Sequence, residues 1–282
     1  KILQQLGNHA SEPAPISYTH TRFVGRAEEQ EKLQQLLGTP GVHLVEVQGK
    51  SGMGKTALLR KFLEEQKDSL TLFSRCRPEE HVPFKALDAP IDQLYDWLIR
   101  QDLSWVDQLY HTLPDATLVL FPTLRRFSMV RASPGKLPME PAMVRAEAFH
   151  GLTLLLSAIA QKKSMLLWVD DFQWVDEDSL LLLKQLLRKI QGNFFLLISS
   201  RMDGPSPATR LQWTADLSLE MGPLSLEALR EMAPMLLKDQ AETLLEQSQG
   251  VPFLVEQGLR GQGVLSRLNQ CSPEAIQLLK IS

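Results

Sequence analysis

The segment GKSGMGKT at Gly49–Thr56 constrains this chain more than any other. It matches the pattern G-x-x-x-x-G-K-[ST] at every fixed position, directly after a β-branched apolar run and before a helical pattern. The loop glycines permit backbone conformations that other residues rarely adopt, and they let backbone amide groups approach phosphate oxygens. These glycines are Gly49, Gly52 and Gly54. The helix that follows adds the positive end of its dipole. The segment therefore predicts a phosphate-binding loop.

The residues that end this loop have distinct predicted roles. Lys55 is expected to be the point charge for the β- and γ-phosphates of a nucleotide. The hydroxyl of Thr56 is expected to be a ligand of Mg²⁺. Met53 and Ala57 are placed with the loop glycines among the residues that bind the nucleotide.

A second anchor for the metal is expected at the end of a neighbouring strand. The run LLWVDD places Asp170 and Asp171 after four apolar residues, Leu166–Val169. Because open α/β sheets bind ligands at the carboxyl ends of their strands, both carboxylates are expected beside the loop. Asp170 is predicted to hold Mg²⁺ through water, and Asp171 to orient the attacking water. Asp171 is one methylene shorter than the glutamate common at this position in fast P-loop ATPases, which indicates slow turnover.

Strand-like runs alternate with helical patterns along most of the chain. This alternation predicts an α/β fold, a P-loop NTPase three-layer sandwich with a parallel sheet. The broken, proline-rich helices at about 77–143 are too long for an ordinary βα loop, so we expect a helical insertion in a nucleotide-binding domain at 23–214. Only helices follow Pro223, which predicts a helical lid subdomain at 215–270.

Composition excludes several classes of function. Lys and Arg number 30 against 33 Asp and Glu, so the net charge of −3 offers no basic field for nucleic acid. The two cysteines are far apart and fit no metal spacing, which favours a reducing compartment. No apolar run approaches the roughly 20 residues that span a bilayer. We expect a cytoplasmic fragment of a longer protein with no membrane and no direct nucleic-acid partner.

With these two motifs in place, the chain resembles the STAND branch of AAA+-type P-loop NTPases, in particular the AAA ATPase module of bacterial multidomain regulators. The resemblance runs from about Phe23 to the C-terminus. FVGRAEE is similar to the family's hhGRExE box, with Ala27 where glutamate is common. By this resemblance Val24, Gly25 and Arg26 would lie beside the adenine and ribose of ATP.

Three more segments carry the resemblance. DDFQWVDEDSL is similar to the extended acidic motif D-D-x-x-W-x-D and contains Trp174 and Asp176. FFLLISSR is similar to the sensor-1 strand, which would place Ser200 and Arg201 near the γ-phosphate. GVPFLVEQ is similar to the G-x-P box of the lid, with Pro252 closing over the nucleotide.

The flanking segments imply neighbouring domains. SPEAIQLLKIS resembles the first helix of a winged-helix domain, truncated here at 271–282, and a repeat sensor usually lies beyond it. The insertion is similar to one in bacterial Ser/Thr kinases that carry this ATPase module, so 1–22 would be the linker behind a kinase domain.

The leading interpretation is an ATP-dependent switch that binds ATP and Mg²⁺ between the α/β core and the helical lid and hydrolyses ATP slowly. The switch would control how the flanking domains pack, or the formation of an ATP-dependent homo-oligomer. One alternative is a AAA+ remodelling ATPase, although the arginine pattern of such enzymes is not evident in the sequence. Arg210 could serve as an arginine finger in an oligomer, but a solvated Arg210 is the simpler interpretation. Another is a non-hydrolysing nucleotide-binding scaffold. A P-loop small-molecule kinase is less well supported, because no site for an acceptor substrate is evident.

Overall fold

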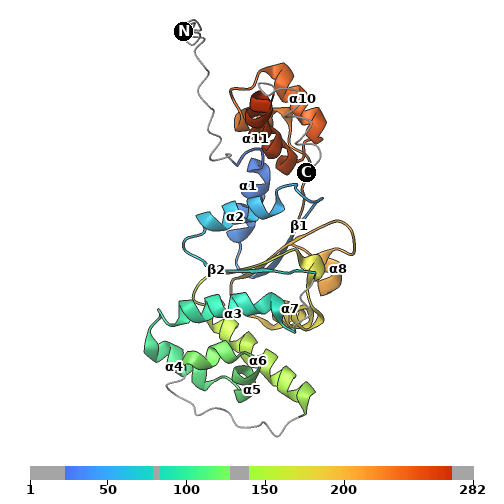
Figure 1. Cartoon of the computed structure of the whole chain (residues 1–282). Helices are drawn as coiled ribbons and strands as arrows, with labels where there is room; N and C mark the ends of the chain where they lie inside the picture. Colours follow the sequence, from blue (N-terminus) through green and yellow to red (C-terminus); the bar gives the residue numbers. More distant parts are fainter. Residues whose placement is uncertain (1–22, 79–82, 128–139, 269–282) are drawn as a thin grey trace, which may run out of the picture. The chain divides into compact units, whose positions relative to one another are not determined.

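The computed structural model describes residues 23–78, 83–127 and 140–268 (Figure 1). The chain forms two compact units: one is Arg26–Gly222, and the other combines Lys1–Gly25 with Pro223–Ser282. The predicted domain boundaries at 23–214 and 215–270 stay predictions. The predicted linker at 1–22 and winged-helix start at 271–282 lie outside the described residues.

The larger unit alternates helices and strands. In chain order its elements are α1 (Ala27–Leu37), β1 (Val42–Gln48), α2 (Lys55–Glu65), β2 (Leu70–Arg75), α3 (Lys85–Leu98), α4 (Leu103–His111), α5 (Asp115–Leu120), η1 (Pro122–Phe127), α6 (Pro141–Ala160), β3 (Met165–Asp170), η2 (Phe172–Trp174), α7 (Glu177–Lys189), β4 (Phe194–Ser200), α8 (Pro207–Leu211) and β5 (Leu217–Glu220). The smaller unit contains α9 (Leu226–Met232), α10 (Lys238–Ser248) and α11 (Pro252–Leu268).

The five strands form one parallel sheet in the order β2-β3-β4-β1-β5. β3 and β4 are buried along their whole length, as parallel strands covered on both faces usually are. The edge strand β2 alternates between more and less buried positions. Helices α1 and α2 lie on one face of the sheet, and α3, α6 and α7 lie on the other (Figure 1). The predicted three-layer α/β fold is confirmed.

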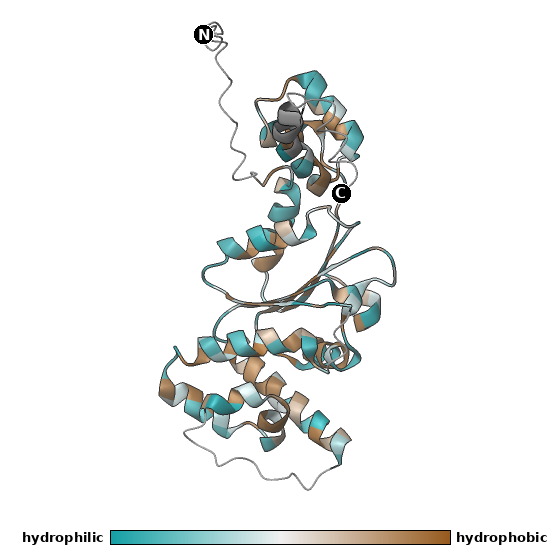
Figure 2. Ribbon diagram, viewed as in Figure 1, coloured by the Kyte–Doolittle hydropathy of each residue, from teal (hydrophilic) through white to brown (hydrophobic). Residues whose placement is uncertain are grey.

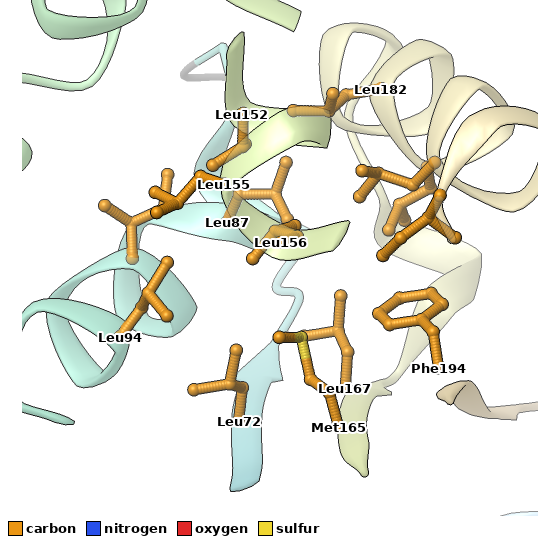
Figure 3. Close-up of a cluster of buried hydrophobic side chains, with 14 of the residues drawn as sticks. Leu72, Leu87, Leu94, Leu152, Leu155, Leu156, Met165, Leu167, Leu182 and Phe194 are labelled. Carbon is orange, nitrogen blue, oxygen red and sulfur yellow. The ribbon is translucent and has the colours of Figure 1, made fainter. Parts of the chain in front are cut away.

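The main hydrophobic core fills the space between the sheet and α3, α6 and α7. Side chains of the strands, Leu72 and Leu167 among them, face Leu155 and its neighbours on α6 (Figure 3). The helices between β2 and α6 extend the same core, since Val106 and Leu124 are fully buried in it. Apolar residues follow the strands and α6, whereas the outer faces of α1 and α2 are hydrophilic (Figure 2). The helices in the segment predicted as an insertion are therefore packed on the sheet unit.

Helix α6 is the one helix, among the described residues, whose length and composition would allow it to cross a membrane. The sequence of α6 contains no uninterrupted apolar run of that length, because Arg145 and Glu147 lie within it. Leu152, Leu155 and Ile159 of α6 are buried in the main core. The burial of these side chains accounts for the apolar character of α6.

The smaller unit has its own core. Leu229 of α9, Leu244 of α10 and Val255 of α11 are buried together, and Val24 joins them from the segment before α1. The turn after α10 is left-handed, and the Leu224 amide donates to the carbonyl of Gly250 at 2.8 Å. The segment before α9 is thus tied to the turn after α10 by a backbone hydrogen bond, and the segment before α1 joins the same unit through the buried side chain of Val24.

Candidate functional site

The loop between β1 and α2 has the conformation that its glycines predict. Gly52 and Gly54 have φ values of 80° and 87°, in the left-handed region that favours glycine. Gly54 is also the N-cap of α2, so the loop leads directly into a helix N-terminus. Gly49 is required for another reason, since a Cβ there would lie 2.9 Å from the Cβ of Met221, just after β5.

Lys55 is the buried cation of this loop. Its side chain is only 8% exposed, and Nζ donates to the carbonyls of Gly49 at 2.7 Å and Lys50 at 3.0 Å. Burial lowers the pKa of Lys55, while the charges of Asp171 and Asp170 act in the opposite direction. A buried ammonium held among backbone carbonyls is positioned to receive an anion.

Asp170, the last residue of β3, is 1% exposed and receives several hydrogen bonds. The hydroxyl of Thr56 donates to its two carboxylate oxygens at 3.3 and 3.2 Å. Ser199 Oγ donates to Oδ1 at 2.5 Å, and Ser199 in turn accepts from Trp168 Nε1 at 3.1 Å. The structure therefore brings together Thr56 and Asp170, the two predicted ligands of the metal, and buries Trp168 beside them.

Asp171 lies in the left-handed region, with φ of 54°. Its Oδ2 accepts from Arg75 Nε at 3.0 Å and Nη2 at 2.9 Å, and its Oδ1 accepts from Gln173 Nε2 at 3.2 Å. Hydrogen bonding to Asp171 raises the pKa of the Arg75 guanidinium. Arg75 also lies 3.6 Å from Asp170 Oδ2, so one arginine spans both carboxylates.

The end of β4 places three polar residues beside the site. Ser200 is buried, and its hydroxyl accepts from Gln48 Nε2 at 3.4 Å. The side chain of Arg201 is exposed, and its backbone amide donates to Gln173 Oε1 at 3.2 Å. It is Ser199, one residue earlier than the predicted Ser200, that contacts the carboxylate of Asp170.

Asp176, the last acidic residue of the extended motif, begins two helices. It caps α7 by accepting from the Ser179 amide at 2.8 Å. It also accepts from the Phe84 amide at 3.0 Å, at the start of α3, where Phe84 has a left-handed φ of 62°. Asp176 thus joins the start of α3 to the start of α7. Trp174 is 44% exposed.

Two of the predicted nucleotide-binding residues, Gly25 and Arg26, make structural contacts of their own. Gly25 has φ of 69°, and a Cβ there would lie 2.4 Å from the Cβ of Ala228. The Arg26 guanidinium donates to Glu29 at 3.1 Å and to the carbonyl of Gly222.

Pro252 is the first residue of α11, two residues after Gly250. A Cβ at Gly250 would lie 2.7 Å from the Cβ of Pro223. The G-x-P segment therefore forms a tight turn in the smaller unit. Of the other two predicted residues, Met53 is buried in the loop and Ala57 is exposed in the first turn of α2.

Two residues near the acidic pair differ from what the sequence suggests. Arg210 is not simply solvated, because its Nη1 donates to the carbonyls of Phe172 at 3.0 Å and Gln173 at 3.4 Å. Cys76 follows β2, and burial raises the pKa of its thiol to about 12. That thiol is protonated at neutral pH and does not supply a nucleophile.

The residues present fit a nucleotide with a divalent cation. Phosphate binding needs a loop that can turn its amides inward and a cation nearby, which Gly52, Gly54 and the buried Lys55 provide. Magnesium prefers hard oxygen ligands, and the hydroxyl of Thr56 lies within 3.3 Å of the carboxylate of Asp170.

The parallel sheet and its glycine loop define a P-loop nucleotide-binding fold. Residues 22–198 match the family model of the AAA ATPase domain, so the chain belongs to the AAA ATPase domain family. The predicted AAA-type relationship is confirmed, and with it the general class of nucleotide-binding ATPases. A comparison with curated protein sequences found no match.

Several solved structures are similar to this chain. A STAND protein with a tetratricopeptide repeat sensor from Pyrococcus horikoshii is 15% identical, with a TM-score of 0.49 over 86% of this chain and 31% of that chain. The ORC1 protein of Aeropyrum pernix in complex with DNA is 16% identical, with a TM-score of 0.46 over 90% and 63%. A RuvB variant from Thermotoga maritima is 14% identical, with a TM-score of 0.44 over 83% and 60%. This chain spans about a third of the length of the STAND protein.

Sequence reasoning missed three contributors to the site. Ser199 and Arg75 both contact the acidic pair, and Gln173 joins Asp171 to the backbone of Arg201. For Arg75 a signal was present, since it ends a strand-like run as Asp170 does. For Ser199 and Gln173, nothing in the sequence beyond their residue type indicates a contact with the acidic pair.

Proposed function

We propose that this chain is an ATP-binding module that hydrolyses ATP slowly and acts as a regulatory, STAND-type switch within a longer, cytoplasmic signal-transduction protein. The observation that carries the proposal is the burial of Lys55 and Asp170 in one polar cluster at the strand ends. Burying a charge is costly unless it is paired, so such a cluster is typical of a binding site.

The chain's own residues divide the work of binding. Lys55 would exchange its two carbonyl partners for phosphate oxygens, while Thr56 and Asp170 would hold the metal. When bound, Mg²⁺ neutralises charge on the phosphate oxygens. The placement of Val24, Gly25 and Arg26 beside the adenine and ribose stays part of the proposal. The closing of Pro252 over the nucleotide is part of it too.

Slow turnover follows from the surroundings of Asp171. We assign this carboxylate to orienting the attacking water. Its Oδ2 already accepts a hydrogen bond from Arg75 Nε at 3.0 Å and lies 2.9 Å from Nη2 of the same guanidinium, so that oxygen is less available to a water molecule. The short aspartate side chain adds to this limitation.

The switch itself requires a group that responds to the γ-phosphate. We assign this role to Ser200 and Arg201. Burial lowers the pKa of Lys55, and the positive charge of Arg201 lowers it further, which indicates that Arg201 lies within electrostatic range of the loop. A γ-phosphate can drive a change only by binding one conformation better than another. The proposed outputs are rearrangement of flanking kinase, winged-helix and sensor domains, or a homo-oligomer.

The test is single-turnover and steady-state hydrolysis of Mg²⁺·ATP by the purified chain. We expect tight binding with turnover well below the ~10 s⁻¹ typical of enzymes. Arg75→Ala should raise the rate severalfold, because it releases Asp171. Arg145→Ala is the matched control, since Arg145 forms a 2.9 Å pair with Asp178 on the surface.

Other outcomes support the competing functions. Rapid turnover in the wild type would favour a remodelling ATPase. A Lys55→Ala variant that keeps the full output of the parent protein would favour a scaffold in which the nucleotide is structural.

A further inference from the structure

The turn at Phe172–Trp174, which follows the acidic pair, accepts hydrogen bonds from an arginine of another helix. Arg210, near the end of α8, donates to the carbonyls of Phe172 and Gln173, and its guanidinium carbon lies 5.3 Å from the centroid of the Phe172 ring. The Phe172 side chain is 1% exposed, so the turn is fixed on its inner side as well. The backbone at Gln173 is therefore held on two sides.

The amide of Gln173 uses both of its ends. Nε2 donates to Asp171 Oδ1 at 3.2 Å, and Oε1 accepts from the Arg201 amide at 3.2 Å. These partners determine the orientation of the amide, because a carboxylate only accepts and a backbone N–H only donates. Gln173 thus connects the acidic turn to the residue that follows β4.

The two carboxylate oxygens of Asp171 have different donors, one charged and one neutral. Oδ2 is bound by Arg75, whose side chain is 53% exposed, and Oδ1 is bound by Gln173. Without the amide, the carboxylate would be free to rotate toward the arginine, since a charged donor binds a carboxylate more strongly than a neutral one. The hydrogen bond from Gln173 opposes this rotation.

We propose that Gln173 is a positioning residue for ATP hydrolysis: it orients Asp171 Oδ1 relative to the end of β4, and Arg210 holds the turn in which it acts. The inference rests on the proposed function, because it assumes that Asp171 orients the attacking water. Gln173 itself contacts neither phosphate nor water in this role. A small displacement of an aligned group is enough to slow a reaction strongly.

The test separates the rate of hydrolysis from ATP binding. Gln173→Leu keeps the volume of the side chain and removes both hydrogen bonds. We expect kcat to fall about tenfold or more, with the dissociation constant of ATP and the melting temperature close to those of the wild type. Gln173→Glu keeps the acceptor for Arg201 and removes the donor to Asp171, so it should be at least as slow.

Two matched controls accompany these variants. Gln161→Leu removes a side-chain hydrogen bond to Gln191 of 3.4 Å, and Arg188→Met removes one to Gln212 of 3.4 Å. Both should leave kcat unchanged, whereas Arg210→Met should lower it less than Gln173→Leu does.

Several results would overturn the inference. Wild-type kcat in Gln173→Leu or in Gln173→Glu would show that the contact with Asp171 is not needed. A parallel loss of kcat, ATP affinity and melting temperature would show a purely structural role. The variant Asp171→Asn distinguishes failure of the proposed function from failure of the inference about Gln173. If it hydrolyses ATP like the wild type, the role of Asp171 in the proposed function fails. If it is inactive while Gln173→Leu is fully active, only the present inference fails.

Discussion

The two units of the chain hold their motif residues in different ways. In the sheet unit, Lys55 and Asp170 are buried charges whose partners are polar groups at the strand ends. In the smaller unit, Gly25 and Gly250 are needed for close backbone packing, and Val24 is part of an apolar core. Buried charges are costly without a function, whereas tight packing is sufficient reason for a glycine or a valine. The phosphate-loop and acidic motifs predict the roles of Lys55 and Asp170, whereas only the resemblance assigns Val24 and Gly25 to the nucleotide.

The largest effect is expected in the sheet unit, from Lys55→Ala. Loss of a buried cation aimed at the phosphates should reduce hydrolysis by about 10²-fold or more, measured as phosphate release. Lys61→Ala is the control, because Lys61 forms only an exposed pair with Glu65 at 3.1 Å. Equal rates of phosphate release in the two variants would mean that Lys55 does not contribute to ATP hydrolysis.

The next largest effect is expected from Asp176, which accepts hydrogen bonds at the starts of both α3 and α7. Asp176→Ala removes an acceptor shared by α7 and α3 and should lower the free energy of unfolding by about 2 kcal/mol or more. Asp102→Ala, which caps α4 alone through the Trp105 amide at 2.9 Å, should cost about 1 kcal/mol. Similar losses in urea unfolding of both variants would argue against the double role of Asp176.

The smaller unit provides the contrasting case. Gly25→Ala combines a left-handed backbone with a Cβ placed 2.4 Å from that of Ala228, and should cost about 2 kcal/mol of stability in that unit. Gly204→Ala, where a Cβ meets nothing within 4 Å, should change stability by less than about 0.5 kcal/mol. If Gly25→Ala is as stable as the wild type but binds ATP more weakly, the contrast between the units is wrong.

The smallest effect is a pH dependence at Lys55. Since burial lowers its pKa below the 10.5 of an unperturbed lysine, the unfolded state binds more protons between the two values. Stability of the wild type should therefore rise with pH in that window, relative to Lys55→Met. Urea unfolding from neutral pH up to 10.5 measures the difference, and a gap that stays constant with pH would contradict the direction of this shift.

Much of the fold could be predicted, because each βα unit has its own local pattern. The loop glycines, the apolar run before Asp170 and the strand that ends at Ser200 were all identified by sequence alone. The particular partner of Asp170 could not be predicted. Every residue of β4 is buried, so no alternation of polar and apolar residues shows that Ser199, and not Ser200, lies on the same face of the sheet as the Asp170 side chain. Within a strand, neighbouring side chains point to opposite faces, and a shift of one residue changes the partner.

Long-range contacts account for the other omissions. Arg75 lies opposite Asp170 in the register of β2 with β3, which depends on how the two strands pair. The bond from the Phe84 amide to Asp176 joins residues 92 positions apart. Such contacts are set by tertiary packing, and no local pattern in the sequence indicates them.

The most direct test is a titration of the purified chain with ATP, with and without Mg²⁺, followed by calorimetry and thermal unfolding. The phosphate loop with Thr56 and Asp170 predicts binding of one nucleotide per chain, tighter with Mg²⁺. At 100 times the dissociation constant, ATP should stabilise the chain by about 2.7 kcal/mol. Asp170→Asn should lose the part of this gain that depends on Mg²⁺. A wild-type chain that neither binds Mg²⁺·ATP nor melts at a higher temperature in its presence would contradict the assignment of Gly49–Thr56 as a nucleotide site.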